Sequence, residues 1–124
     1  MAPKLKPPKV KESDIQSQII DYLIWRGIFV WRNYTGPIVR GGGARKVFFT
    51  PNPAIGAPDI MGVLDNGQML AIEVKTSKGK LSPEQVQFLE NQRQRGALVI
   101  VARSLGDVED AMPAIAKTFK RSPF

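Results

Sequence analysis

Two acidic residues and one lysine near the middle of the chain have the types and spacing to hold a divalent cation beside a phosphate. Asp59 follows a proline, and Glu73 and Lys75 lie two positions apart in the segment IEVK. Carboxylate oxygens, together with the backbone carbonyl of Val74, suit a hard cation such as Mg²⁺. Such an ion lowers the pKa of a bound water and stabilises an in-line displacement at phosphorus. Lys75 would orient the attacking water.

The elements that must position these residues are two predicted strands of a β-hairpin. Segments 59–64 and 69–75 are largely apolar and flank an Asn-Gly turn, which is a strong hairpin signal. Alternate residues of a strand point to one face, so Glu73 shares its face with the lysine two residues later. Antiparallel pairing would also bring Asp59 near Glu73 and Val74. For these residues alone, an edge strand with alternating charges is the other interpretation.

An amphipathic helix is predicted before the hairpin, over residues 12–25. Its apolar residues recur at three- and four-residue steps, at Ile15, Ile19, Tyr22 and Leu23. Glu12 lies in its first turn and could add a ligand or a water contact if the helix packs against the open end of the hairpin. Gly27 is expected to end the helix, and the β-branched and aromatic segment 28–33 predicts a strand.

A second helix is predicted after the hairpin, over residues 83–95. Ser82 at the N-cap, Pro83 at the first helical position and Gln85 at the third form a capping-box pattern. The capping pattern accounts for Gln85 without a further role.

The last part of the chain predicts a buried strand over residues 97–102, followed by a third helix. This helix is expected to run from Ser104 to about Phe119, and Pro113 would interrupt or kink it.

Cationic residues gather around a glycine-rich segment in the first half of the chain. Residues 34–46 hold three consecutive glycines flanked by Arg40, Arg45 and Lys46. We expect a flexible cationic loop, which is either a DNA-contacting loop or a plain connection. A brief strand is predicted over residues 47–49.

The composition excludes several functional classes. The 124 residues include no cysteine and no histidine, which excludes disulfides, Cys/His zinc sites and nucleophilic catalysis by a thiol or a histidine-activated serine. The 18 Lys and Arg against 11 Asp and Glu give a net charge of +7. This favours nucleic acid as partner, because neutralising phosphates releases counterions. Lys78 and Lys80, near the predicted site, are either phosphate contacts or solvated charges.

The sequence predicts one domain between two basic ends. A mobile basic arm is expected at residues 1–11, a single domain at 12–119 and a basic tail at 120–124. No apolar run approaches the roughly 20 residues of a membrane span, and the basic N-terminus lacks the apolar core of a signal peptide. We therefore expect a soluble cytoplasmic protein with no membrane partner.

The combined pattern resembles the VRR-NUC domain, the virus-type replication and repair nuclease family within the PD-(D/E)XK nuclease superfamily. The resemblance covers roughly residues 12–107. The segments that carry it are Glu12-x3-Gln16, Trp31-Arg32-Asn33, Gly56-Ala-Pro-Asp59-Ile, Ile72-Glu-Val-Lys-Thr76 and Gly79-Lys-Leu-Ser82-x2-Gln85. This resemblance implies an α/β fold with a restriction-endonuclease-like αβββαβ core, in which helices flank a mixed central sheet.

The resemblance also implies roles for single residues and a reaction. Asp59 and Glu73 would be metal ligands, Lys75 the catalytic lysine, Glu12 the helix-borne acidic residue of the site and Gln85 a glutamine that lines it. The implied cofactor is Mg²⁺ or Mn²⁺, and the implied reaction is hydrolysis of phosphodiester bonds in DNA.

The resemblance further implies a substrate and an assembly. Stand-alone relatives of this size, from phages and bacteria, resemble Holliday junction resolvases of DNA repair and recombination that act as homodimers. Because larger relatives that cut flaps carry extra domains, four-way junctions are the expected substrate. A flap, general or restriction-type endonuclease and a non-catalytic nucleic-acid-binding module are the other hypotheses. Trp25, Phe29 and Trp31 are candidate dimer contacts, although packing in the core is the expectation for these aromatic residues.

Overall fold

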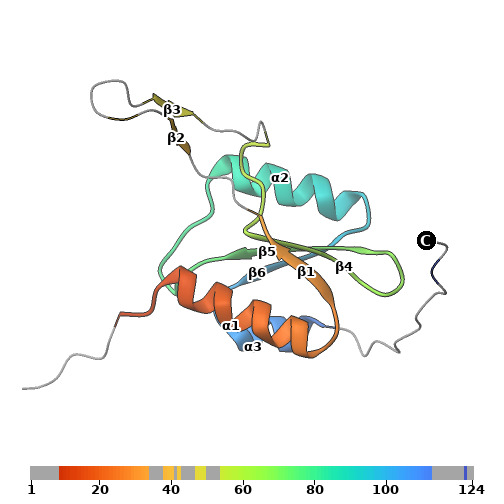
Figure 1. Cartoon of the computed structure of the whole chain (residues 1–124). Helices are drawn as coiled ribbons and strands as arrows, with labels where there is room; N and C mark the ends of the chain where they lie inside the picture. Colours follow the sequence, from red (N-terminus) through yellow and green to blue (C-terminus); the bar gives the residue numbers. More distant parts are fainter. Residues whose placement is uncertain are drawn as a thin grey trace, which may run out of the picture.

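The computed structural model describes residues 9–33, 38–40, 42, 47–49, 54–112 and 122. Within them the chain forms three helices and six strands (Figure 1). In chain order these are α1 (Glu12–Trp25), β1 (Phe29–Arg32), β2 (Ile38–Arg40), β3 (Val47–Phe49), β4 (Ile60–Val63), β5 (Met69–Val74), α2 (Pro83–Gln94), β6 (Leu98–Ala102) and α3 (Leu105–Ala111).

Four of the strands form one mixed sheet in the order β1-β4-β5-β6. The first three pair antiparallel, as expected for a hairpin and its neighbour, whereas β5 and β6 pair in parallel across the α2 crossover. Figure 1 shows α2 on one side of this sheet and α1 with α3 on the other. The α/β fold with an αβββαβ core and a mixed sheet is therefore confirmed.

The central strand β5 is buried on both faces because helices cover both sides of the sheet. On the α1 side, Leu70, Ile72 and Val74 of β5 belong to the same apolar core as Ile19 and Leu23 of α1, and all five are fully buried. The three- and four-residue spacing of apolar positions in α1 produces this contact, since it gathers them into one stripe.

The ends of the helices follow the sequence signals. α1 and α2 begin where predicted, and Gly27 after α1 has a φ of 75°. The third helix begins after Ser104 and is interrupted before Pro113, which is one of the two expected outcomes, because α3 ends at Ala111 and Met112 is extended. The residue before a proline disfavours the helical conformation, which accounts for the end of α3 before Pro113. The rest of the expected helix, to Phe119, lies outside the described residues.

The predicted glycine-rich loop contains a strand that the sequence reasoning missed. β2 pairs antiparallel with β3 and forms a separate two-stranded sheet. The β-branched pair Ile38 and Val39 favours this extended conformation, opposite the apolar residues of the predicted strand at 47–49. Arg40 is the last residue of β2, and Arg45 and Lys46 lie outside the described residues.

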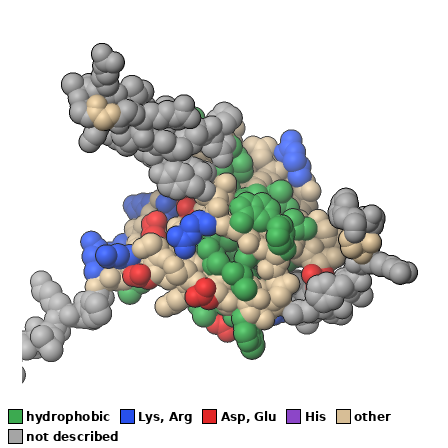
Figure 2. All heavy atoms as spheres, in the orientation of Figure 1, with side chains coloured by type: hydrophobic (Ala, Val, Ile, Leu, Met, Phe, Trp, Pro, Cys, Tyr) green, Lys and Arg blue, Asp and Glu red, His purple; other side chains and the backbone are tan. Residues whose placement is uncertain are grey.

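The expectation that three aromatic residues pack in the core is wrong. Trp25, Phe29 and Trp31 are 80%, 70% and 41% exposed. Phe29 and Trp31 alternate with Val30, which packs against the core, so they point to the face opposite α1. Because β1 is the edge strand, α2 does not cover them. Figure 2 shows hydrophobic side chains gathered on the face of the molecule that carries β1.

None of the helices in the described part of the chain has the length and apolar character needed to cross a membrane.

Candidate active site

Asp59 and Glu73 meet where β4 begins and β5 ends. The register pairs Ile60 with Ile72, so the next positions along the antiparallel ladder are Asp59 and Glu73. The Val74 backbone N–H donates a hydrogen bond of 2.9 Å to Oδ2 of Asp59. The hairpin register inferred from the Asn-Gly turn therefore places these three residues together, as predicted.

The Glu73 side chain is buried and only partly satisfied. The residue is 2% exposed. Its Oε1 accepts a 2.9 Å hydrogen bond from Nε2 of Gln85 and lies 3.7 Å from Nζ of Lys75. Its other oxygen, Oε2, is buried and has no hydrogen-bond partner among the described residues. A buried carboxylate oxygen without a partner is costly unless a ligand satisfies it.

The electrostatic environment of Glu73 disfavours its charged form. Burial, the largest cause, and the nearby carboxylate of Asp59 raise the pKa of Glu73 from 4.5 to about 8, although the ammonium of Lys75 acts to lower it. The charge of Glu12 is a smaller contribution that also raises the pKa. Two close carboxylates that lack a sufficient positive partner have the electrostatic environment of a cation site.

Gln85 has two roles in this geometry. Its Oε1 accepts the Ser82 backbone N–H at 2.9 Å, and the Ser82 Oγ accepts the Gln85 backbone N–H at 3.2 Å, which completes the predicted capping box. The same side-chain amide donates from Nε2 to Glu73. An amide has both an acceptor and a donor, so one residue starts α2 and holds the carboxylate.

Glu12 lies at the start of α1 and is close enough to raise the pKa of Glu73. Within the described ranges, however, no three His, Cys, Asp or Glu side chains form a cluster that could hold a metal ion. The structure therefore brings Asp59 and Glu73 together, with Glu12 outside their immediate cluster.

Lys75 is held at the C-terminal end of β5 by the neighbouring parallel strand. Its backbone N–H donates to the Ala102 carbonyl at 2.9 Å. Its side chain is 13% exposed and lies beside Glu73. The ammonium group is thus the positive charge next to the two carboxylates.

Asp59 is held in place by two residues to which the sequence analysis assigned no role. The Asn33 backbone N–H donates to the Asp59 carbonyl at 2.7 Å, and the Asn33 Nδ2 donates to the Pro58 carbonyl at 3.1 Å. Gly56 has a φ of 87°. A Cβ there would clash with the Glu84 carbonyl and lie 2.8 Å from the Gln85 nitrogen. Both residues belong to segments that carry the family resemblance, but the sequence alone assigned no role to either.

The comparisons with known proteins identify the family of this chain. The sequence profile of the VRR-NUC domain matches residues 44–105, which is half of the chain and includes Asp59, Glu73, Lys75 and Gln85. The chain belongs to the VRR-NUC domain family. A nuclease-type, DNA-processing domain follows from this membership, and VRR-NUC nucleases generally depend on a divalent metal.

Two solved structures resemble the VRR-NUC domain described above. One, titled "VRR_NUC domain", has a TM-score of 0.57 and 26% identity, and the match covers 82% of this chain and 94% of that one. Another, titled "VRR_NUC domain protein", has a TM-score of 0.53 and 15% identity over 84% of this chain and 86% of that one, and it supports the fold alone. No curated protein matches the chain.

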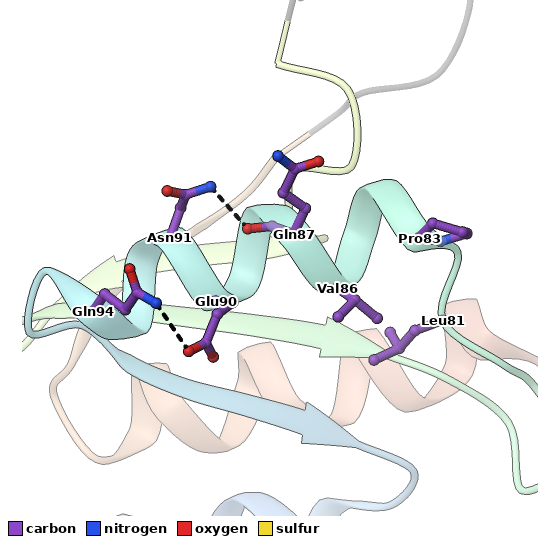
Figure 3. Close-up of a pocket in the computed structure, with 7 residues that line it drawn as sticks. All are labelled: Leu81, Pro83, Val86, Gln87, Glu90, Asn91 and Gln94. Atoms are coloured by element: carbon purple, nitrogen blue, oxygen red, sulfur yellow. Dashed lines mark hydrogen bonds between the residues drawn. The ribbon is translucent and has the colours of Figure 1, made fainter.

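A separate hollow lies on the outer side of α2, apart from the candidate active site. It has a volume of about 580 Å³ and an apolar rim from Leu81, Pro83 and Val86 (Figure 3). Glu90, the acidic residue that lines it, is paired with Arg93 at 2.6 Å. None of the catalytic candidates lines this hollow, so it plays no part in the chemistry considered below.

The raised pKa of Glu73 predicts how the stability of the metal-free protein depends on pH. Between pH 4.5 and about 8, the folded protein keeps a proton on Glu73 that the unfolded chain releases. Its contribution to stability is therefore fully present below pH 4.5 and is lost as the pH rises to about 8. Urea unfolding in EDTA should give a lower free energy of unfolding at pH 8.5 than at pH 5.5 for the wild type, and a smaller difference for Glu73→Gln. Equal pH slopes for the two proteins would contradict the assignment.

The close packing of Gly56 predicts a specific loss of stability. Gly56→Ala should lower the free energy of unfolding by about 1–3 kcal/mol, because the new Cβ both strains the backbone and clashes with α2. Gly67→Ala is the matched control, since Gly67 has the same φ of 87° but nothing within 4 Å of the added carbon. Urea unfolding should show the larger loss for Gly56→Ala, and equal losses would exclude the clash.

Proposed function

We propose that this chain is a metal-dependent, structure-selective DNA endonuclease that resolves four-way junctions as a homodimer. The observation that carries the proposal is the buried Glu73 carboxylate, with one unpartnered oxygen, beside Asp59 and the ammonium of Lys75. Purely structural carboxylates are normally hydrogen-bonded at both oxygens or solvated. The arrangement is therefore better suited to a cation and a phosphate than to holding the fold together.

The residues present fit a divalent cation such as Mg²⁺ or Mn²⁺. Asp59 and Glu73 offer carboxylate oxygens. The Val74 carbonyl is a further ligand, since the Val74 N–H points to Asp59 and the N–H and C=O of a strand residue face the same neighbouring strand. Mg²⁺ commonly uses one or two carboxylates and keeps several waters, so Glu12 can act through a water. When bound, the ion supplies Lewis-acid stabilisation of the charge at the scissile phosphate.

The other residues of the site have defined tasks in this proposal. Lys75 orients the attacking water and donates to the phosphate oxygens as negative charge builds up on them. Gln85 holds one oxygen of Glu73 and leaves the other for the ion. As water attacks phosphorus, the bond to the leaving oxygen breaks and that oxygen takes up a proton.

DNA is the substrate of a nuclease domain, and a net charge of +7 favours contact with its backbone. Contacts to phosphate carry no sequence information, which favours recognition by shape. Exposed Lys78 and Lys80 follow directly after the site and are proposed phosphate contacts. The assignment of four-way junctions comes from the resemblance to small resolvases.

The uncovered face of β1 supports the homodimer. The rings of Phe29 and Trp31 lie with their centroids 5.5 Å apart on this edge strand, next to partly exposed Val63 of β4. Exposed apolar clusters of this kind mark contact surfaces. A second copy related by a two-fold axis would cover the same patch on both chains and present two active sites to opposed strands.

Cleavage assays with and without metal test the nuclease proposal. A synthetic four-way junction should be nicked on opposed strands in Mg²⁺ or Mn²⁺, in preference to flap, duplex and single-stranded DNA, and not in EDTA. Glu73→Gln and Lys75→Ala should lower the cleavage rate by about 10²- to 10³-fold or more, because each removes a group that stabilises developing charge. Both variants should still bind DNA.

The matched control for Glu73→Gln is Glu109→Gln, which neutralises an exposed carboxylate on α3 and should cut at the wild-type rate. Preferred cutting of flaps or duplex would keep the nuclease and refute the junction assignment. Binding without cutting in any divalent ion would refute catalysis and favour the binding-module hypothesis.

Charge placed on the β1 patch tests the dimer. In sedimentation equilibrium, the wild type should have twice the mass of one chain and Phe29→Glu/Trp31→Glu the mass of one, because two charges would be buried in the interface. Val86→Glu, on the exposed face of α2, is the control and should stay dimeric. The double variant should also replace paired junction nicks by single ones. A wild type that stays monomeric on the junction would exclude the homodimer.

A further inference from the structure

A groove lies beside the candidate active site, between the segment that leads into α1 and the turn that follows β5. Its volume is about 610 Å³. The polar and turn residues that line it are Lys9, Thr76, Ser77, Lys78, Gly79 and Arg103. Figure 1 shows the segment after β5 passing close to the start of α1, and Figure 2 shows Lys and Arg side chains at this end of the molecule.

The lining of the groove suits an anion attached to a less polar group. It contains three cations, from Lys9, Lys78 and Arg103, and no acidic side chain. Lys9 and Lys78 are exposed and have no hydrogen bond or ion pair with any other described residue. Val10 and Ile15 give the groove an apolar part. Two free ammonium groups across such a surface match the charged phosphates of a nucleic-acid strand and the less polar C–H faces of its sugars.

Arg103 holds the turn that forms one wall of the groove. Its Nη1 donates to the carbonyls of Thr76 and Gly79 at 2.6 and 2.7 Å, and the Gly79 N–H donates to the Thr76 carbonyl at 3.1 Å. The Arg103 backbone is itself held, since its N–H donates to Asp107 Oδ2 at 2.8 Å. The wall is therefore formed before any ligand arrives, which lowers the conformational entropy that is lost on binding.

The same turn contacts the catalytic lysine. Thr76 directly follows Lys75, and a Cβ on Gly79 would lie 3.3 Å from Cδ of Lys75. Gly79 thus packs against the Lys75 stem. A strand of DNA lying in the groove would pass directly beside the ammonium that the proposed function places at the scissile phosphate.

We propose that this groove binds the phosphodiester backbone of the DNA strand on one side of the scissile phosphate. Lys9 and Lys78 contact successive phosphates, and the Arg103-held turn sets their distance from Lys75. The inference rests on the proposed function for its ligand, but its test measures binding rather than cleavage.

Salt-dependent binding is the first test. Fluorescence anisotropy of a labelled four-way junction in EDTA, where the proposed reaction is absent, gives Kd over a range of KCl concentrations. Each of Lys9→Ala and Lys78→Ala should lower the slope of log Kd against log [KCl] by about 0.9, the value for one lost phosphate contact on duplex DNA. The double variant should weaken binding about three- to tenfold at 100 mM KCl. Arg95→Ala, which removes an exposed cation at the far end of α2, is the charge-matched control and should keep the wild-type slope.

Neutral backbone linkages locate the contact. Methylphosphonate linkages placed on one side of the cut, or near the branch if no cut is found, should weaken wild-type binding. In Lys9→Ala/Lys78→Ala the same linkages should cause little further loss of affinity, because the lysine contacts to these phosphates are already absent. An equal loss of affinity in both proteins, or unchanged salt slopes in both single variants, would refute the proposal that DNA binds in the groove.

These outcomes separate the two proposals. Cleavage by wild type with unchanged slopes in the lysine variants would refute the groove and leave the nuclease standing. Lowered slopes in a protein that cuts no DNA would support the groove as a nucleic-acid site and refute the proposed catalysis.

Discussion

The buried carboxylate of Glu73 is the constraint around which this molecule is organised. It lies on the central strand of the sheet, where covering helices exclude water, so its charge is unfavourable unless positive or hydrogen-bonding partners reach it. Three different elements provide these neighbours. The end of β5 supplies Lys75, α2 supplies Gln85, and the segment before β4 supplies Asp59, whose like charge further disfavours the charged form of Glu73.

Folding and site formation share the same contacts, which explains how a small domain can build this site. The capping box that starts α2 also aims Gln85 at Glu73. The close approach of Gly56 to the same first turn connects α2 to the segment that carries Asp59. Parallel pairing with β6 fixes the backbone of Lys75. A change in any of these contacts therefore alters both stability and the geometry of the carboxylates.

Signals that are local in sequence predicted most of the elements and the pairing of the site. The Asn-Gly turn sets the hairpin register, and Ser82 with Gln85 sets the start of α2, because each depends on only a few neighbouring residues. Features that depend on distant contacts were missed. The exposure of Trp31 follows from the place of β1 at the sheet edge, and the role of Arg103 depends on a turn 24 to 27 residues earlier in the chain. Neither leaves a periodic pattern in the sequence.

In the proposed function, the carboxylate site and the cationic groove contact different phosphates of the DNA. The carboxylates are held from the α2 side, through Gln85, and a cation there would meet the phosphate undergoing reaction. The cationic groove opens near the start of α1, with its wall held by Arg103 from the end of β6. Lys75 lies between them, because its ammonium is beside Glu73 and its stem is against Gly79. On the two proposals, a DNA strand that runs from the groove to the carboxylates would therefore pass Lys75, and the binding of the backbone would be coupled to the position of its ammonium.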